Sequence, residues 1–134
     1  MDTTSTQSLA IHKLMKAFEA KSPQLFSYVS DDIDLRIDHY DDMTDVAWQS
    51  CTSSLELQGL LGRLMHDVFP EGTRIDVLKS QALGAGWTLT LLEQTFWYAV
   101  TECTVRGKSY ITSHEQEGKV DFFREIVYEI EKTE

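Results

Sequence analysis

The stretch Ile33-Asp34-Leu35-Arg36-Ile37-Asp38 alternates strictly between apolar and charged residues. Side chains of a β-strand point alternately to its two faces, so this pattern predicts a strand with one face in the core and the other in solvent. The segments on both sides of it show helical periodicity instead. The sequence therefore predicts a strand enclosed between helices.

Two helices are predicted before this strand. Over residues 8–20, apolar residues recur at helical spacing, while lysines and a glutamate occupy the other face. A second, short helix begins at Ser22 and Pro23, because serine is a good N-cap and proline fits the first turn. Residues 30–32 are expected to end it.

A third helix follows the strand and a polar loop. Ser53 and Glu56 have the spacing of a capping box, in which the serine oxygen accepts a free backbone N–H and the glutamate reaches back. Apolar residues then line one face from Leu57 to Phe69, and Pro70 closes the helix.

From Thr73 onward the apolar period changes to two, which predicts a meander of strands. The predicted strands span residues 74–83, 87–105, 109–116 and 120–130, and the turns are Gly84-Ala85-Gly86, Arg106-Gly107-Lys108 and Glu117-Gly118. Long strands twist and curve. The sequence therefore predicts an α+β fold, a cone-shaped roll of three N-terminal helices packed in a strongly curved antiparallel sheet, with a concave mouth suited to a small ligand.

Length and charge limit the classes of function. The chain has 134 residues and a formal net charge of −10. We expect a single domain over residues 1–134, with an ordered core at about 8–130. Basic residues form no cluster, which argues against nucleic acid and anionic membranes as partners. Because the first residues also lack the pattern of a secretory signal, we expect a cytoplasmic protein.

No metal or cofactor motif occurs in the sequence. Cys51 and Cys103 are the only cysteines, they form no CxxC pair, and no histidine lies at ligand spacing from either. The sequence also lacks a phosphate loop and a nucleophile elbow. We expect reduced thiols, no metal and no cofactor.

The order helix–helix–strand–helix followed by four strands resembles the nuclear-transport-factor-2-like (NTF2-like) superfamily, and within it the SnoaL-like and ketosteroid-isomerase-like groups. The segments that carry the resemblance are residues 33–38, Leu61 to Pro70 with Gly72 and Thr73, and Glu117-Gly118-Lys119-Val120 followed by Phe123-Arg124-Glu125. The resemblance covers roughly residues 8 to 130.

The resemblance implies a cystatin-like α+β roll with an apolar pocket at its open end, often in a homodimer packed through the sheet. Members include isomerases, polyketide cyclases, epoxide hydrolases and dehydratases, and others bind ligands or act as scaffolds without catalysis. Some SnoaL-like members end the last strand with an aspartate, where this chain has Ile126-Val127-Tyr128-Glu129. No family catalytic residue is therefore transferred to this chain, and the fold alone does not select a function.

Asp38, His39 and Tyr40 form the first candidate group, at the end of the early strand. Desolvation at an apolar rim raises the pKa of a carboxyl, which can then act as a base next to a carbonyl, and an imidazole can relay the proton. Alternation lets either Asp38 and Tyr40, or His39 alone, face inward. The alternative is an exposed acidic turn.

Glu93 is the second candidate, because it interrupts the apolar row that runs from Trp87 to Trp97 in period two. If that row faces the core, Glu93 needs a partner or a shifted pKa. A bulge that turns it outward, or a salt bridge across the sheet, is the alternative.

His114 and Arg124 come from the last two predicted strands. Counting from the Glu117-Gly118 turn places His114 near Asp121 or Phe122, where a structural pair is favoured over a catalytic role. Arg124 could bind an anionic substrate or pair with Glu93. The candidate catalytic residues are thus Asp38, His39, Glu93 and His114, and the candidate ligand contacts are Tyr28, Tyr40, Trp48, Trp97, Phe122 and Arg124.

Three functions remain open at this point. The first is a metal-free isomerase, cyclase or hydrolase that uses a pocket carboxylate on a small apolar carbonyl or polycyclic substrate. The second is a ligand-binding domain without turnover, and the third is a dimeric scaffold with a filled cone. Large side chains on both faces of one strand, at Phe96, Trp97, Tyr98 and Val100, predict a homodimer through the sheet.

Overall fold

The computed structural model describes residues 9–40 and 47–133, so residues 41–46 of the polar loop predicted after the early strand lie outside the described residues. The helical segments are α1 (Ala10–Glu19), the 3-10 helix η2 (Pro23–Tyr28), α2 (Ser54–Arg63) and the π-helical turn η3 (Leu64–Val68). The strands are β1 (Val29–His39), β2 (Ser50–Cys51), β3 (Thr73–Gly84), β4 (Trp87–Tyr98), β5 (Cys103–Gln116) and β6 (Lys119–Lys132).

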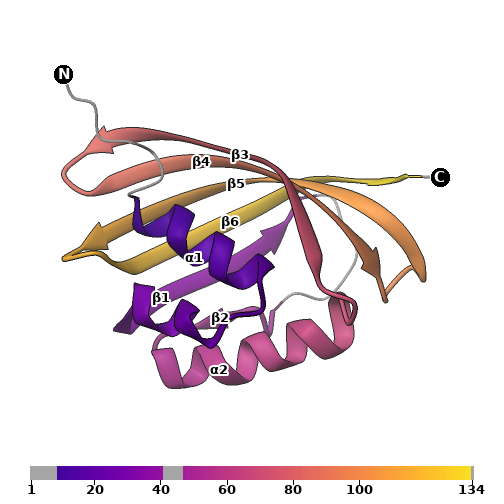
Figure 1. Cartoon of the computed structure of the whole chain (residues 1–134), viewed down its shortest axis with the longest axis horizontal. Coiled ribbons are helices and arrows are strands. Elements are labelled where there is room, and N and C mark those ends of the chain that lie inside the picture. Colours follow the sequence, from indigo (N-terminus) through magenta and orange to yellow (C-terminus); the bar gives the residue numbers. More distant parts are fainter. Residues whose placement is uncertain (1–8, 41–46, 134) are drawn as a thin grey trace.

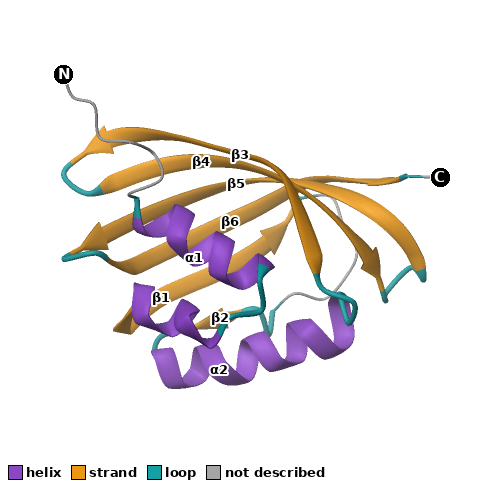
Figure 2. Ribbon diagram, viewed as in Figure 1, coloured by secondary structure: helices purple, strands orange, loops and turns teal. Residues whose placement is uncertain are grey.

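The strands form one six-stranded sheet in the order β2-β1-β6-β5-β4-β3. The sheet is strongly curved, and α1, η2 and α2 pack on its concave side (Figure 1). The colouring by secondary structure in Figure 2 shows the same two layers, helices on one side and strands on the other. The predicted α+β cone is therefore confirmed. No helix of the described residues is long and apolar enough to cross a membrane.

Two helices begin at the predicted caps. The Ser22 hydroxyl oxygen accepts the N–H of Gln24 at 3.2 Å, and the Ser53 hydroxyl oxygen accepts the N–H of Glu56 at 3.1 Å. The Glu56 carboxylate accepts the N–H of Thr52 at 2.8 Å, one residue before the cap. The two serine bonds each satisfy a backbone donor that the first helical turn leaves free, and the Glu56 carboxylate holds the residue before the cap.

The third helix changes its winding before it ends. The Phe69 N–H donates to the Leu64 carbonyl at 3.1 Å, which closes a π-helical turn. Such a turn is rare and is often found beside functional sites. Here it leaves Leu64, Val68 and Phe69 buried against the sheet.

The sheet is mixed rather than purely antiparallel. Strands β3 to β6 form the predicted antiparallel meander, but β1 runs parallel to β6, with Ile37 opposite Glu125. Parallel neighbours need a long crossover connection, and here α2 and the first three strands of the meander supply it. Strand β1 also begins at Val29, so residues 30–32 belong to the strand and not to the end of the second helix.

The turn between β4 and β5 lies at Ala99–Glu102, so the prediction of a turn at Arg106-Gly107-Lys108 is wrong. The Glu102 N–H donates to the Tyr98 carbonyl at 2.8 Å, and Glu102 has a φ of 54°. Gly107 is instead a residue of β5 opposite Gln94. A Cβ atom at Gly107 would lie 3.3 Å from the Phe96 ring, so the glycine makes room for that side chain.

The core face of β4 is the opposite of the one predicted. Leu92, Phe96 and Tyr98 are buried on the concave side, whereas Trp87 and Leu91 are exposed. Both rows of this strand mix apolar and polar residues, so alternation alone does not distinguish them. Contacts between the two layers identify the buried row, because the Phe69 ring packs edge-on against Phe96 with centroids 5.3 Å apart.

Candidate functional site

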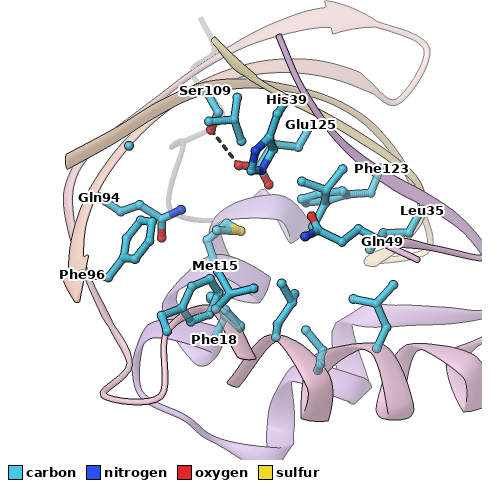
Figure 3. A pocket seen from close by; sticks show the side chains of 18 of the residues that line it. Met15, Phe18, Leu35, His39, Gln49, Gln94, Phe96, Ser109, Phe123 and Glu125 are labelled. Atoms are coloured by element: carbon cyan, nitrogen blue, oxygen red, sulfur yellow. Dashed lines mark hydrogen bonds between the residues drawn. The ribbon is translucent and has the colours of Figure 1, made fainter. Parts of the chain in front are cut away.

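An apolar cavity of about 100 Å³ lies between the concave face of the sheet and the helices (Figure 3). Helix α1 contributes Leu14, Met15 and Phe18 to its wall, and α2 with η3 contributes a row of leucines that ends near Phe69. A dry cavity of roughly 150 Å³ is enough to take up benzene. At about two thirds of that volume, the cavity suits a small molecule of one ring at most.

A few polar side chains interrupt this apolar wall. Besides Tyr98, they are His39, Gln49, Gln94, Ser109 and Glu125. None of the described residues that line the cavity is a lysine or an arginine. A few polar groups converging in an apolar pocket are typical of a small-molecule site.

Glu125 is the buried acid of the cavity wall. It lies in the middle of β6 between β1 and β5, and only 6% of its surface is exposed. The Ser109 hydroxyl donates to its Oε2 atom at 2.7 Å. Burial raises the pKa of Glu125 to about 7, although the Ser109 hydrogen bond acts in the opposite direction. This carboxyl thus changes its charge near neutral pH.

His39 is the one predicted catalytic residue in the cavity wall. It follows Ile37 on the same face of β1, and Ile37 lies opposite Glu125 on β6. Figure 3 shows both side chains at the same end of the cavity. Of the two orientations that alternation allowed, His39 alone facing inward is the one that occurs.

The neighbours of His39 face away from the cavity. Asp38 accepts a hydrogen bond from the Nε of Arg36 at 2.9 Å on the outer face of β1. Tyr40 is 72% exposed. The expectation that Asp38 could serve as a pocket base is therefore corrected: its parity on the strand is that of Arg36, not that of Leu35 and Ile37.

Glu93 also lies on the outer face, and its predicted inward orientation is wrong. It pairs with Arg106 across the strands, with Oε1 and Nη2 2.7 Å apart. The cross-strand salt bridge considered as the alternative is the one found. Trp97 shares this parity and does not line the cavity.

His114 forms the predicted cross-strand pair with Asp121. Its Nδ1 atom lies 2.7 Å from Asp121 Oδ1, and its Nε2 atom lies 3.0 Å from the Ala85 carbonyl oxygen. The hydrogen bond to Asp121 raises the pKa of His114. Two acceptors around one ring favour the doubly protonated, charged imidazole. This histidine fastens the β3–β4 turn to the sheet and lies away from the cavity.

None of the six predicted ligand contacts lines the cavity. Phe122 and Arg124 lie on the outer face, with the guanidinium 5.0 Å from the ring centroid, and Arg124 approaches Asp34 at 3.9 Å rather than Glu93. Trp48 packs against the core and under the guanidinium of Arg63 at 4.2 Å. Tyr28 likewise packs against the core, and Tyr40 and Trp97 lie as described above.

Sequence reasoning missed Gln49, Gln94, Ser109 and Glu125. One signal was available for Glu125, which stands between Phe123 and Val127 in period two just as Glu93 stands between apolar residues. The sequences around Glu93 and Glu125 show the same pattern, and only the packing of the sheet determines that Glu125 is the one that faces the cavity. Gln49 follows a loop and carries no periodic signal.

No family model matches this sequence, and no curated protein matches it. Solved structures do match its fold. An NTF2-like protein from Anabaena variabilis has a TM-score of 0.72 at 9% identity, over 98% of this chain and 98% of its own. A protein of unknown function with a cystatin-like fold from Xanthomonas campestris has a TM-score of 0.70 at 14% identity, over 88% and 87%.

An enzyme is also among the similar structures. The LEH-like epoxide hydrolase of M. tuberculosis has a TM-score of 0.65 at 14% identity, over 92% of this chain and 84% of its own. Identities this low establish the shared architecture and nothing about substrates.

Proposed function

We propose that this chain, which has the NTF2-like α+β fold, is an acid–base enzyme that moves a proton on a small, uncharged and mostly apolar molecule. Glu125 is the group that takes and returns the proton. The observation that carries the proposal is the position of this carboxyl, buried in the wall of an apolar cavity with a pKa of about 7.

A carboxyl with such a pKa is well matched to proton transfer. A general acid or base works best when its pKa lies near the working pH, because both protonation states are then accessible. An ordinary exposed glutamate is almost fully ionised at neutral pH and is a weaker base. Burial of an acid without a cationic partner is unfavourable for folding, and such groups are concentrated at functional sites.

The proposed step is a simple shift of a proton. The ionised Glu125 removes a proton from a carbon next to a carbonyl, and the electrons of the broken C–H bond pass to the carbonyl oxygen as an enolate. The neutral acid then returns the proton to the same carbon or to a conjugated one. Ser109 binds Oε2 of Glu125, which leaves Oε1 for the substrate. His39 places an imidazole on the same wall.

Ligand binding without turnover is the alternative, because the cavity itself is compatible with both functions. The two differ in whether bound molecules exchange carbon-bound protons. A panel of monocyclic ketones, incubated with the protein in D₂O, reports this exchange directly by ¹H NMR.

For at least one ketone of the panel we expect exchange that Glu125→Gln slows by roughly 10²- to 10⁴-fold, the usual contribution of a general base. Glu71→Gln is the matched control, since it removes an exposed carboxylate elsewhere on the chain. If wild type and Glu125→Gln give the same exchange rate across the whole panel, the catalytic proposal is wrong and the binding function remains.

A further inference from the structure

We propose that Gln49 and Gln94 bind acceptor oxygen atoms of the ligand, so that the cavity selects neutral monocyclic oxo compounds over hydrocarbons and over carboxylates. The inference adopts the cavity of the proposed function as the ligand site, but it concerns binding and does not require turnover.

Gln49 presents a buried amide to the cavity. The residue is 2% exposed, and its backbone carbonyl accepts the Ile37 N–H at 2.9 Å, which fixes it beside β1. Its side chain lines the cavity. An amide carries N–H donors as well as a carbonyl acceptor, so Gln49 can donate a hydrogen bond to an acceptor atom of a ligand held there.

Gln94 presents a defined end of its amide to the cavity. The Thr73 hydroxyl donates to its Oε1 atom at 2.8 Å. Because the carbonyl end is bound to Thr73, the NH₂ end remains for the cavity (Figure 3). An NH₂ group can only donate hydrogen bonds. The ligand atom opposite Gln94 must therefore be an acceptor.

The charges around the cavity disfavour anionic ligands. No described lysine or arginine lines the wall, and Glu125 becomes negative above neutral pH. A carboxylate would enter an apolar site without a counter-charge and close to another carboxylate, which is costly. An uncharged ketone oxygen supplies the acceptor that Gln94 requires without a negative charge, and the cavity volume limits the molecule to about one ring.

Cyclohexanone is the probe that tests this inference, with methylenecyclohexane and cyclohexanecarboxylate as matched comparisons. The first comparison keeps the shape and removes the oxygen acceptor, and the second adds a negative charge. We expect cyclohexanone to bind most tightly and to move the side-chain NH₂ signals of Gln49 and Gln94 in ¹H–¹⁵N spectra.

Substitution of either glutamine should weaken the binding of the ketone and leave the binding of the hydrocarbon unchanged. We expect Gln49→Met and Gln94→Met each to raise the Kd for cyclohexanone roughly five- to tenfold, the share of one hydrogen bond, and to leave methylenecyclohexane binding unchanged. Gln58→Met, on the exposed face of α2, is the control and should change neither. The wild-type NH₂ shifts report the contact even if a variant fails to fold.

The inference is overturned if cyclohexanone and methylenecyclohexane bind equally, if cyclohexanecarboxylate binds better, or if neither amide signal moves on titration. Its failure is distinguishable from that of the proposed function. If the amide signals shift but no proton exchanges, ligand binding by Gln49 and Gln94 stands and catalysis by Glu125 fails. If protons exchange but the amide signals do not shift, catalysis stands and the role of the two amides fails.

Discussion

Glu125 is the residue at which folding and chemistry compete most directly. Its pKa rises from 4.5 in the unfolded chain to about 7 in the cavity wall. Between these values the unfolded chain has released the proton and the folded chain retains it. The stabilisation that comes from the protonated form is therefore complete below pH 4.5 and is lost as the pH rises through 7, by about 3 kcal/mol in total.

Glu125→Gln should remove this dependence on pH. The amide keeps an oxygen for the Ser109 hydroxyl and carries no charge. Urea unfolding at a series of pH values should show that the variant gains stability relative to wild type from pH 4.5 to 8, by about 3 kcal/mol at the upper end. Parallel stability curves for the two proteins would contradict this account of Glu125.

Ser109→Ala should raise the pKa of Glu125 further. The serine hydroxyl donates to the carboxylate and so favours its ionised form. We expect the apparent pKa from ¹³C NMR of the carboxyl carbon to increase in the variant. Ser113→Ala, at another buried serine of β5 that does not line the cavity, is the control and should leave it unchanged. A lower pKa in Ser109→Ala would reverse the assigned role.

Single elements shape the cavity through close packing, and β5 does so through Gly107. An alanine there would place its Cβ 3.3 Å from the Phe96 ring, which already packs edge-on against Phe69. The ring would have to move, and it lines the cavity. We expect Gly107→Ala to weaken cyclohexanone binding several-fold as measured by NMR titration.

Gly59→Ala is the matched control for this substitution. Gly59 lies in α2 with nothing within 4 Å of an added Cβ. Alanine is favoured over glycine in a helix, so the variant should gain about 0.5–1 kcal/mol of stability without a change in affinity. Equal effects of both substitutions on binding would show that Gly107 has no special relation to the cavity.

Periodicity predicts elements well and their partners poorly. Residues 33–38 identify β1 because the alternation is a local property of the chain, and the capping residue Ser53 marks the start of α2 for the same reason. The parallel pairing of β1 with β6 depends on a connection through most of the chain. The core face of β4 depends on Phe69 and Phe96, which are distant in sequence.

The candidate site could be predicted only in part for the same physical reason. His39 was identified because it ends an alternating strand. The cavity forms where α1, α2 and four strands meet, and its acid and amides acquire their roles from burial that only the folded chain produces. Alternation therefore selects Glu93 of β4 as the inward-facing acid, whereas the folded chain buries Glu125 of β6.

At the scale of the whole molecule, the outer face of the sheet carries an apolar row. Leu91, Tyr110 and Ile126 lie directly opposite one another on three neighbouring strands, and all three are exposed. The Tyr128 ring packs against Tyr110 with centroids 4.8 Å apart and the ring planes tilted by 32°. We propose that this exposed apolar row is the contact surface of the homodimer that the sequence predicts.

Tyr110→Glu should dissociate such a dimer, because it places a charge in the centre of the row. Sedimentation analysis should give a dimer mass for wild type that falls to the monomer mass in the variant or on dilution. Glu71→Gln, in the exposed turn before β3 and outside the apolar row, should behave as wild type. A monomer mass at all concentrations of the wild-type protein would refute the dimer.

The central claim is that the cavity holds a carboxyl poised for proton transfer near neutral pH, and ¹³C NMR titration of the Glu125 carboxyl carbon tests it without any substrate. The account predicts an inflection at a pH of about 7 that is absent from spectra of Glu125→Gln. An inflection near 4.5, the ordinary value, would mean that Glu125 is solvated in the folded protein and would contradict both the stability argument and the proposed catalysis.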